Sequence, residues 1–170
     1  KSPQYSDLFT GAINGRKVLT VEVPVFRDGE VIYDLCFSPP ISIFQDLVEK
    51  QRPDQLWTVS LVDTKAIVFA RVPNPSATIG KQASGAIYDA MSRSSEETLS
   101  TVSLDGVPLS SAFTTSRLTG WRVVAGVAES SLIAPLWRNI AITSLIGGIL
   151  LLTGLTFAVR MATTIARGEM

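Results

Sequence analysis

The sequence predicts an α+β fold, in which an antiparallel sheet is flanked by helices and followed by one membrane-spanning helix at the C-terminal end. Three observations predict it. Short segments of alternating apolar and polar residues are joined by hairpin-type turns, which indicates antiparallel strands. Other segments repeat their apolar residues at helical spacing. Near the end of the 170 residues, a stretch of 21 residues carries no charge.

The first two predicted strands form a hairpin. In residues 16–26, Leu19 and three valines alternate with polar residues, which indicates a half-buried strand. Asp28-Gly29 predicts a tight turn, because both residues readily adopt positive φ. The return strand covers residues 31–37 and ends before Pro39-Pro40.

The rest of the soluble part predicts two helices and further strands. Residues 41–50 place their apolar side chains on one helical face, and a second short helix is expected at 86–91. The other expected strands cover residues 57–61, 67–70, 98–104, 108–116 and 121–127. Because the turns between them are short, the strands should pair antiparallel, with the helices covering one face of the sheet.

The charge-free stretch covers residues 139–159, with Asn139 and Val159 as its ends. As a helix it would be about 31 Å long, which matches a bilayer core of about 30 Å. A buried core helix is the alternative, but soluble helices of this length rarely lack every charge. We also expect an exit helix over residues 130–138, which leads from the last strand into the membrane.

The charges around this span indicate its orientation. Arg160 and Arg167 follow it against a single acidic residue, Glu169, so the positive-inside rule places residues 160–170 in the cytoplasm. Residues 1 to about 138 would then be extracytoplasmic, and the span would contact membrane lipid. The small residues at 144 and 148 are spaced as in helix-dimer contacts, which is compatible with a homodimer.

Composition excludes several functions for this stretch of sequence. Fifteen basic and fifteen acidic residues give no net charge, so nucleic-acid binding has no electrostatic basis. The chain has no histidine and one cysteine, Cys36, which we expect to be a buried apolar residue. The adjacent acids Glu96-Glu97 lie in a polar segment. We therefore predict no catalytic residues, no metal site and no cofactor.

Several segments, taken in their order along the chain, resemble the Cache family of extracytoplasmic sensors, whose modules have a PAS-like fold. These segments are Ser6-Asp7-Leu8-Phe9-Thr10-Gly11, Val21-Glu22-Val23-Pro24-Val25, Ser60-Leu61-Val62-Asp63, Ile67-Val68-Phe69-Ala70-Arg71 and Thr119-Gly120-Trp121-Arg122-Val123. The central turn departs from the family, because Thr64-Lys65-Ala66 replaces a glycine-containing turn. The resemblance implies a receptor of the bacterial inner membrane, in particular a two-component sensor histidine kinase that works as a homodimer.

The resemblance also implies a division of the chain. Residues 1–15 would form the junction to an upstream, membrane-distal segment, and residues 16–129 would form the sensor module. In double Cache sensors the membrane-distal module usually holds the ligand. The resemblance therefore favours a membrane-proximal relay module for this chain.

Three residues are candidates for binding a small amino or organic acid. Arg71 ends a strand beside a proline-rich loop and could bind a carboxylate with two hydrogen bonds. A structural ion pair with Asp63 or another acid at the hairpin is the simpler interpretation. Tyr33 shares a face with Leu35, so we expect it in the core.

The sequence leaves several functions open. The first hypothesis is a sensor or relay module that moves the exit helix to control a cytoplasmic output. Chemoreceptors and cyclic-dinucleotide enzymes carry similar sensors. A membrane-tethered structural or interaction domain is the alternative of another class, and a tethered enzyme would need catalytic residues outside this chain.

Overall fold

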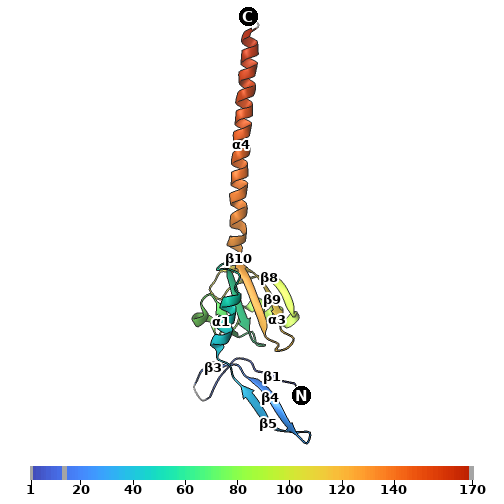
Figure 1. Ribbon diagram of the computed structural model, residues 1–170. Helices are drawn as coiled ribbons and strands as arrows, with labels where there is room; N and C mark the ends of the chain where they lie inside the picture. Colours follow the sequence, from blue (N-terminus) through green and yellow to red (C-terminus); the bar gives the residue numbers. More distant parts are fainter. Residues whose placement is uncertain (1, 13–14, 169–170) are drawn as a thin grey trace. The chain divides into compact units, whose positions relative to one another are not determined.

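The computed structural model describes residues 2–12 and 15–168, and Figure 1 shows the order of their elements. The chain divides into two compact units, residues 1–129 and residues 130–170. The first unit contains the strands and the three short helices. The second consists of the long helix α4 (Glu129–Gly168), which begins at the boundary.

A five-stranded antiparallel sheet forms the centre of the first unit. Its strand order is β7-β6-β10-β9-β8, and every neighbouring pair is antiparallel, as the short turns predicted. The strands are β6 (Trp57–Val62), β7 (Val68–Val72), β8 (Glu96–Val102), β9 (Pro108–Thr115) and β10 (Arg122–Ala128). Strand β10 follows β9 along the chain but pairs with both β9 and β6, so it occupies the middle of the sheet.

The helices cover both faces of this sheet, and the expectation of one covered face was wrong. Helix α1 (Ile41–Gln51) contributes Phe44 and Val48 to an apolar cluster with Phe69. Helix α3 (Gly85–Arg93) contributes Ile87 to a second cluster with Val62. Successive side chains of a strand point to opposite faces, and apolar residues on both sides of β6 and β7 therefore need a helix on each side. The short helix α2 (Pro75–Thr78) lies between β7 and α3.

The predicted hairpin exists, but it belongs to a separate sheet. Strands β4 (Val21–Arg27) and β5 (Glu30–Phe37) pair antiparallel, and the order of this smaller sheet is β1-β4-β5. Strand β1 covers Gln4–Tyr5, while β2 (Phe9–Thr10) and β3 (Lys17–Val18) form a two-stranded pair. All eight residues of β5 are exposed.

This exposure contradicts two expectations from the sequence. Tyr33 was expected in the core, yet it is 71% exposed. Cys36 was expected to be buried, yet its side chain is also exposed. Both expectations assumed that the hairpin belongs to the central sheet, whereas the described residues cover neither face of β5.

Helix α4 contains the predicted membrane span. Residues Ile140–Phe157 have a mean hydropathy of 2.1 and are long and apolar enough to cross a membrane. The side chains of Asn139 and Val159, the predicted ends of the span, lie outside the described residues. Strand β10 ends at Ala128 and α4 begins at Glu129, so no residue separates the central sheet from this helix.

Candidate functional site

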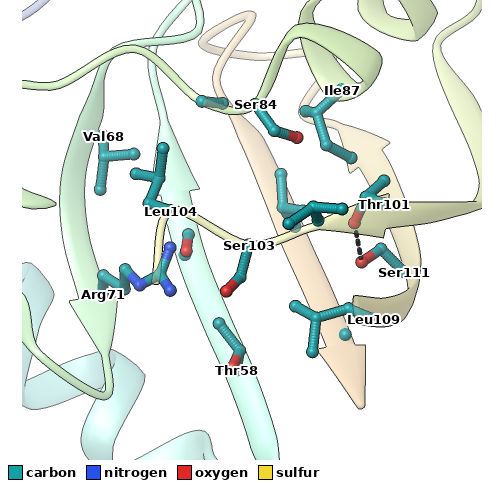
Figure 2. A pocket seen from close by; sticks show the side chains of 15 residues that line it. Thr58, Val68, Arg71, Ser84, Ile87, Thr101, Ser103, Leu104, Leu109 and Ser111 are labelled. Atoms are coloured by element: carbon teal, nitrogen blue, oxygen red, sulfur yellow. Dashed lines mark hydrogen bonds between the residues drawn. The ribbon is translucent and has the colours of Figure 1, made fainter. Parts of the chain in front are cut away.

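A pocket lies on the α3 side of the central sheet (Figure 2). Five strands contribute to it: β6 with Thr58 and Ser60, β7 with Arg71, β8 with Thr101, β9 with Ser111, and β10 with Gly126. Apart from Arg71, these residues have small side chains, which leave space above the sheet. Residues 102–104 and Ile87 of α3 also line the pocket.

Arg71 supplies the only charged side chain that lines this pocket in the described part of the chain. It pairs with Ser60 across the β6–β7 ladder, and this register directs both side chains to the α3 side. Its side chain is 5% exposed. Gln45 of α1 accepts a hydrogen bond from the Arg71 backbone N–H at 3.0 Å and donates one to the Arg71 carbonyl at 2.8 Å. The backbone of this edge strand is therefore held by α1.

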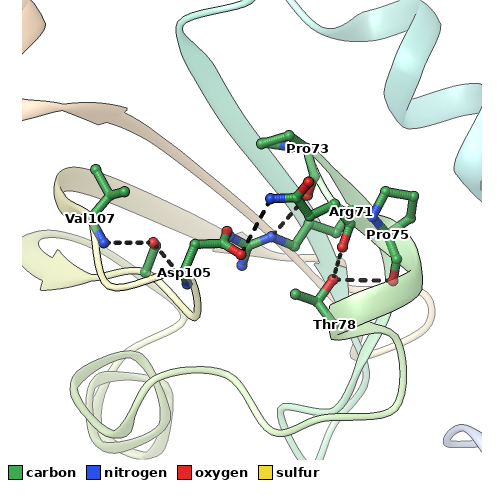
Figure 3. Close-up of polar contacts among 8 residues, drawn as sticks. Arg71, Pro73, Pro75, Thr78, Asp105 and Val107 are labelled. Atoms are coloured by element: carbon green, nitrogen blue, oxygen red, sulfur yellow. Dashed lines mark hydrogen bonds and ion pairs between the residues drawn. The ribbon is translucent and has the colours of Figure 1, made fainter.

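The guanidinium group of Arg71 forms an ion pair with the carboxylate of Asp105 (Figure 3). Nη2 of Arg71 donates to Oδ2 of Asp105, while Nε donates to the Pro73 carbonyl at 3.3 Å. The Asn74 amide also donates to Asp105, at 3.4 Å. Asp105 lies in the turn between β8 and β9, and its side chain is 27% exposed. This turn therefore places one carboxylate where a carboxylate ligand would otherwise meet Arg71.

The size of the pocket decides what it can hold. Its interior volume is about 40 Å³, and one water molecule needs about 10–15 Å³ on the same measure. The pocket therefore has room for a few waters and not for an amino acid. Deeper in it, the hydroxyl groups of Thr101 and Ser111 are 2.8 Å apart and share a hydrogen bond. With Arg71 and Asp105 paired, this state is closed to small organic acids.

Asp63 stabilises the turn between β6 and β7. Its side chain is fully buried and accepts hydrogen bonds from three backbone N–H groups, those of Leu8 at 2.9 Å, Lys65 at 3.0 Å and Ile67 at 2.8 Å. Ala66 in this turn has φ of 62°, a conformation that favours glycine. The Asp63 carboxylate thus stabilises a turn whose positive-φ position is occupied by Ala66 and not by glycine.

The N-terminal segment is attached to the same turn. Asp7 accepts hydrogen bonds from the backbone N–H of Thr64 at 3.0 Å and from its hydroxyl at 2.6 Å, and it forms an ion pair with Lys65 at 3.4 Å. Burial raises the pKa of Asp7, but the two Thr64 hydrogen bonds and the Lys65 charge outweigh it, and the pKa lies below its ordinary value of 3.8. Residues 6–8 are therefore fixed to the central sheet.

Trp121 also contacts the N-terminal segment. Its indole N–H donates to the Ser6 carbonyl at 3.2 Å. Its ring makes edge-to-face contacts with Tyr5, Phe44 and Phe69, at centroid distances of 6.1, 5.6 and 5.1 Å. Such pairs contribute about 0.5–1.5 kcal/mol each beyond their burial. Trp121 directly precedes β10, so the N-terminal segment, α1 and the start of β10 meet at one side chain.

The structure does not bring the three predicted ligand residues together. Arg71 lines the pocket, Asp63 lies in the β6–β7 turn, and Tyr33 lies in the smaller sheet. Arg71 forms its ion pair with Asp105 and not with Asp63. Sequence reasoning identified Asp105-Gly106 only as a turn. Arg71 and Asp105 are 34 residues apart, and nothing in the local pattern of either segment indicates the other.

Comparison with solved structures shows which fold this is. The extracellular domain of rpHK1S-Z16, assigned as a histidine kinase, matches with a TM-score of 0.65 and 17% identity, over 78% of this chain and 56% of that one. The periplasmic sensory domain of the Campylobacter jejuni chemoreceptor Tlp1 matches with a TM-score of 0.63 and 14% identity, over 79% of this chain and 52% of that one.

The fold is Cache-like. A third match is the ligand-binding domain of the Pseudomonas fluorescens chemoreceptor CtaA in complex with L-serine, with a TM-score of 0.53 and 10% identity, over 76% of this chain and 56% of that one. The Cache-like chain therefore spans about half the length of the solved domains that it matches. No protein-family model and no curated protein matches it.

Proposed function

We propose that this chain is a membrane-proximal relay module of a transmembrane receptor, and that the receptor is a sensor histidine kinase. In this proposal residues 1–138 are extracytoplasmic, residues 139–159 cross the bacterial inner membrane, and the receptor works as a homodimer. The Cache-like fold supports a sensor, and the matched extracellular domain of rpHK1S-Z16 supports the kinase.

The connection between β10 and α4 carries the proposal. Strand β10 is hydrogen-bonded on both sides within the central sheet, and the residue after its end begins α4. A flexible linker would absorb a displacement, but here no linker residues are present. Any change that shifts β10 must therefore shift the first turn of α4. A receptor that switches between two conformations needs such a rigid connection to transmit the change in conformation across the membrane.

The closed pocket favours relay over direct sensing. Its interior of about 40 Å³ does not admit an amino acid, and its guanidinium group is already paired. The best-anchored input is instead the N-terminal segment, which Asp63, Thr64 and Trp121 hold through hydrogen bonds. Movement of this segment would reach β10 through Trp121.

Insertions at the β10–α4 connection test the relay. One to four alanines after Glu129 in the intact receptor would each rotate the downstream helix by about 100° and advance it by about 1.5 Å. We expect autophosphorylation of the receptor in membranes to rise and fall with the helical phase. Four alanines after the exposed Leu118 are the matched control and should leave autophosphorylation unchanged.

Two results would contradict different parts of this proposal. Autophosphorylation that is identical in all four insertion variants would refute the relay. An intact receptor without kinase activity would refute the kinase assignment and leave the relay to be measured through the actual output.

A second function, binding of a small carboxylate, rests on the buried Arg71 in the pocket. The matched CtaA domain is in complex with L-serine, an amino acid with a carboxylate. If the turn containing Asp105 moves away, Arg71 could bind such a group with two hydrogen bonds. Thermal-shift measurements with L-serine, L-alanine and L-asparagine test this, because a ligand of the native state raises the melting temperature.

The variants Asp105→Asn and Arg71→Met sharpen that measurement. Binding at Arg71 predicts a larger shift for Asp105→Asn than for the unmodified receptor, and none for Arg71→Met. Equal shifts in all three proteins would place the ligand elsewhere.

A further inference from the structure

The β4–β5 hairpin carries an apolar face that the described residues leave uncovered. Strand register pairs Val21 with Phe37, Val23 with Leu35 and Val25 with Tyr33, so these six side chains share one side of the hairpin. We call them the hairpin face. Val21 is half-buried, and the other five are between 39% and 71% exposed. The opposite side pairs Glu22 with Cys36 and Pro24 with Asp34, which makes it more polar there, but beyond the bulge it also carries the apolar pair Phe26 and Val31.

This pattern is typical of a strand pair with one buried side. Antiparallel strands that face water on one side alternate apolar and polar residues, with the apolar side against a core. In the central sheet, apolar residues on both faces are covered, by α1 on one face and by α3 on the other. Figure 1 shows no helix packed on β4 or β5. The sequence of the hairpin thus predicts a buried face, but the described residues include no apolar side chains that cover it.

The outer edge of β5 is open as well. The sheet order β1-β4-β5 gives β5 one neighbour, so one side of an eight-residue strand presents its backbone groups without a partner strand in the described sheet. Proteins protect long apolar edges by short strands, charges or a covering element, because an open edge pairs with other chains. In β5, Glu30 and Asp34 are the only charged residues.

We propose that the hairpin face and the edge of β5 are completed by the polypeptide that precedes Lys1 in the full receptor. The matched solved domains are about twice as long as the part that this chain covers. Extracytoplasmic sequence ends where a membrane helix begins, and the central sheet here runs directly into α4. This inference rests on the function proposed above: if residues 1–138 are extracytoplasmic, the additional length of such a domain comes before this chain.

The position of β1 supports the same occupant. Strand β1 pairs with β4, so the chain enters this structure through the smaller sheet itself. Polypeptide upstream of Gln4 is therefore already beside the hairpin. It would add at least one strand to β5 and pack apolar side chains on the hairpin face. The boundary between the two modules then falls near residues 38–40 and not at residue 15, and the hairpin belongs to the upstream module.

Thiol labelling in the full-length receptor tests this. In a Cys36→Ser background, single cysteines are introduced as Leu35→Cys on the hairpin face and as Leu118→Cys in the β9–β10 turn. These two leucines are 66% and 71% exposed in the present structure, so they are matched. We expect a membrane-impermeant maleimide to label Leu35→Cys at least about tenfold more slowly than Leu118→Cys in native membranes, and equally fast in denaturant.

Equal native rates for the two cysteines would overturn the proposal. Slow labelling of Leu35→Cys that becomes fast when the receptor is dissociated into monomers in detergent would also overturn it, because a second copy would then cover the face. Hydrogen exchange of the unmodified receptor provides a measurement without substitutions. Slow exchange of the amides in residues 30–37 of the monomer supports the proposal, and exchange at the rate of an open edge contradicts it.

Discussion

Replacement of Asp105 by alanine should destabilise the sensor unit strongly, because it leaves Arg71 charged and unpaired. The Arg71 side chain is 5% exposed and the Asp105 side chain 27%. Removing one partner of a buried ion pair costs about 3–5 kcal/mol. Partial exposure of the removed group reduces this, so we expect a loss of about 3 kcal/mol. For the 129 residues of this unit, this corresponds to a melting temperature lower by about 12 °C.

The unequal burial of the two partners predicts an asymmetry. Arg71→Met leaves Asp105 without its cation, but Asp105 keeps access to water, so the expected loss is only about 1 kcal/mol. The double variant Arg71→Met/Asp105→Ala has no buried charge and an apolar side chain of similar length. We expect it to be more stable than Asp105→Ala by about 2 kcal/mol.

Thermal unfolding of the purified receptor, followed by tryptophan fluorescence, measures all four proteins, because Trp57 and Trp121 lie in and beside the central sheet. The reasoning is refuted if Asp105→Ala costs less than Arg71→Met. It is also refuted if the double variant is no more stable than Asp105→Ala.

Three further predictions use the same assay. Phe69→Ala removes a fully buried ring that contacts Trp121, and should cost about 3–5 kcal/mol; a loss below about 1 kcal/mol would contradict its place in the core. Gly126→Ala would put a Cβ atom 2.6 Å from Oγ of Ser111 and should cost about 1–3 kcal/mol, whereas Ser111→Gly in the same chain should relieve part of it. Asp7 has a lowered pKa in the folded protein, so its contribution is present above its ordinary pKa of 3.8 and is lost as the pH falls through the lower folded value. Asp7→Asn should therefore destabilise the unit at pH 7 and progressively less below pH 3.8; a difference from the unmodified protein that does not change with pH would contradict the pKa direction.

Local sequence patterns predicted most of the longer elements. Apolar–polar alternation, turn residues and an uncharged stretch can each be recognised from residues that are close together in the sequence. The turns at Asp28-Gly29 and Asp105-Gly106 both join antiparallel strands, since Gly29 and Gly106 adopt the positive φ that their hairpins require. The span near the C-terminus was recognisable for a similar reason, because helix length and apolar composition are read directly from consecutive residues.

Pairing across the chain was not predictable in this way. Alternation in residues 31–37 correctly indicated a strand, but it could not show whether the apolar side faces this chain's own core. Tyr33 and Cys36 were misplaced for that reason. Arg71 was recognised as notable, but its partner lies in a turn 34 residues away, and only the assembly of β7, β8 and β9 in one sheet brings them together.

The sequence by itself determined the longer strands, the hairpin turns, the apolar span and the α+β class, because each follows from the spacing of neighbouring side chains; the two-residue strands β1 and β2 and the short helix α2 were not predicted. Tertiary structure decided three other features: the middle position of β10, the helices on both sides of the sheet, and the Arg71–Asp105 pair that closes the pocket. These depend on which surfaces meet when apolar area is removed from water, and that choice involves residues from the whole unit at once. The connection from β10 into α4 depends on both the sequence and the tertiary structure. Its residues are adjacent in the sequence, while the central position of β10 in the sheet comes from the fold.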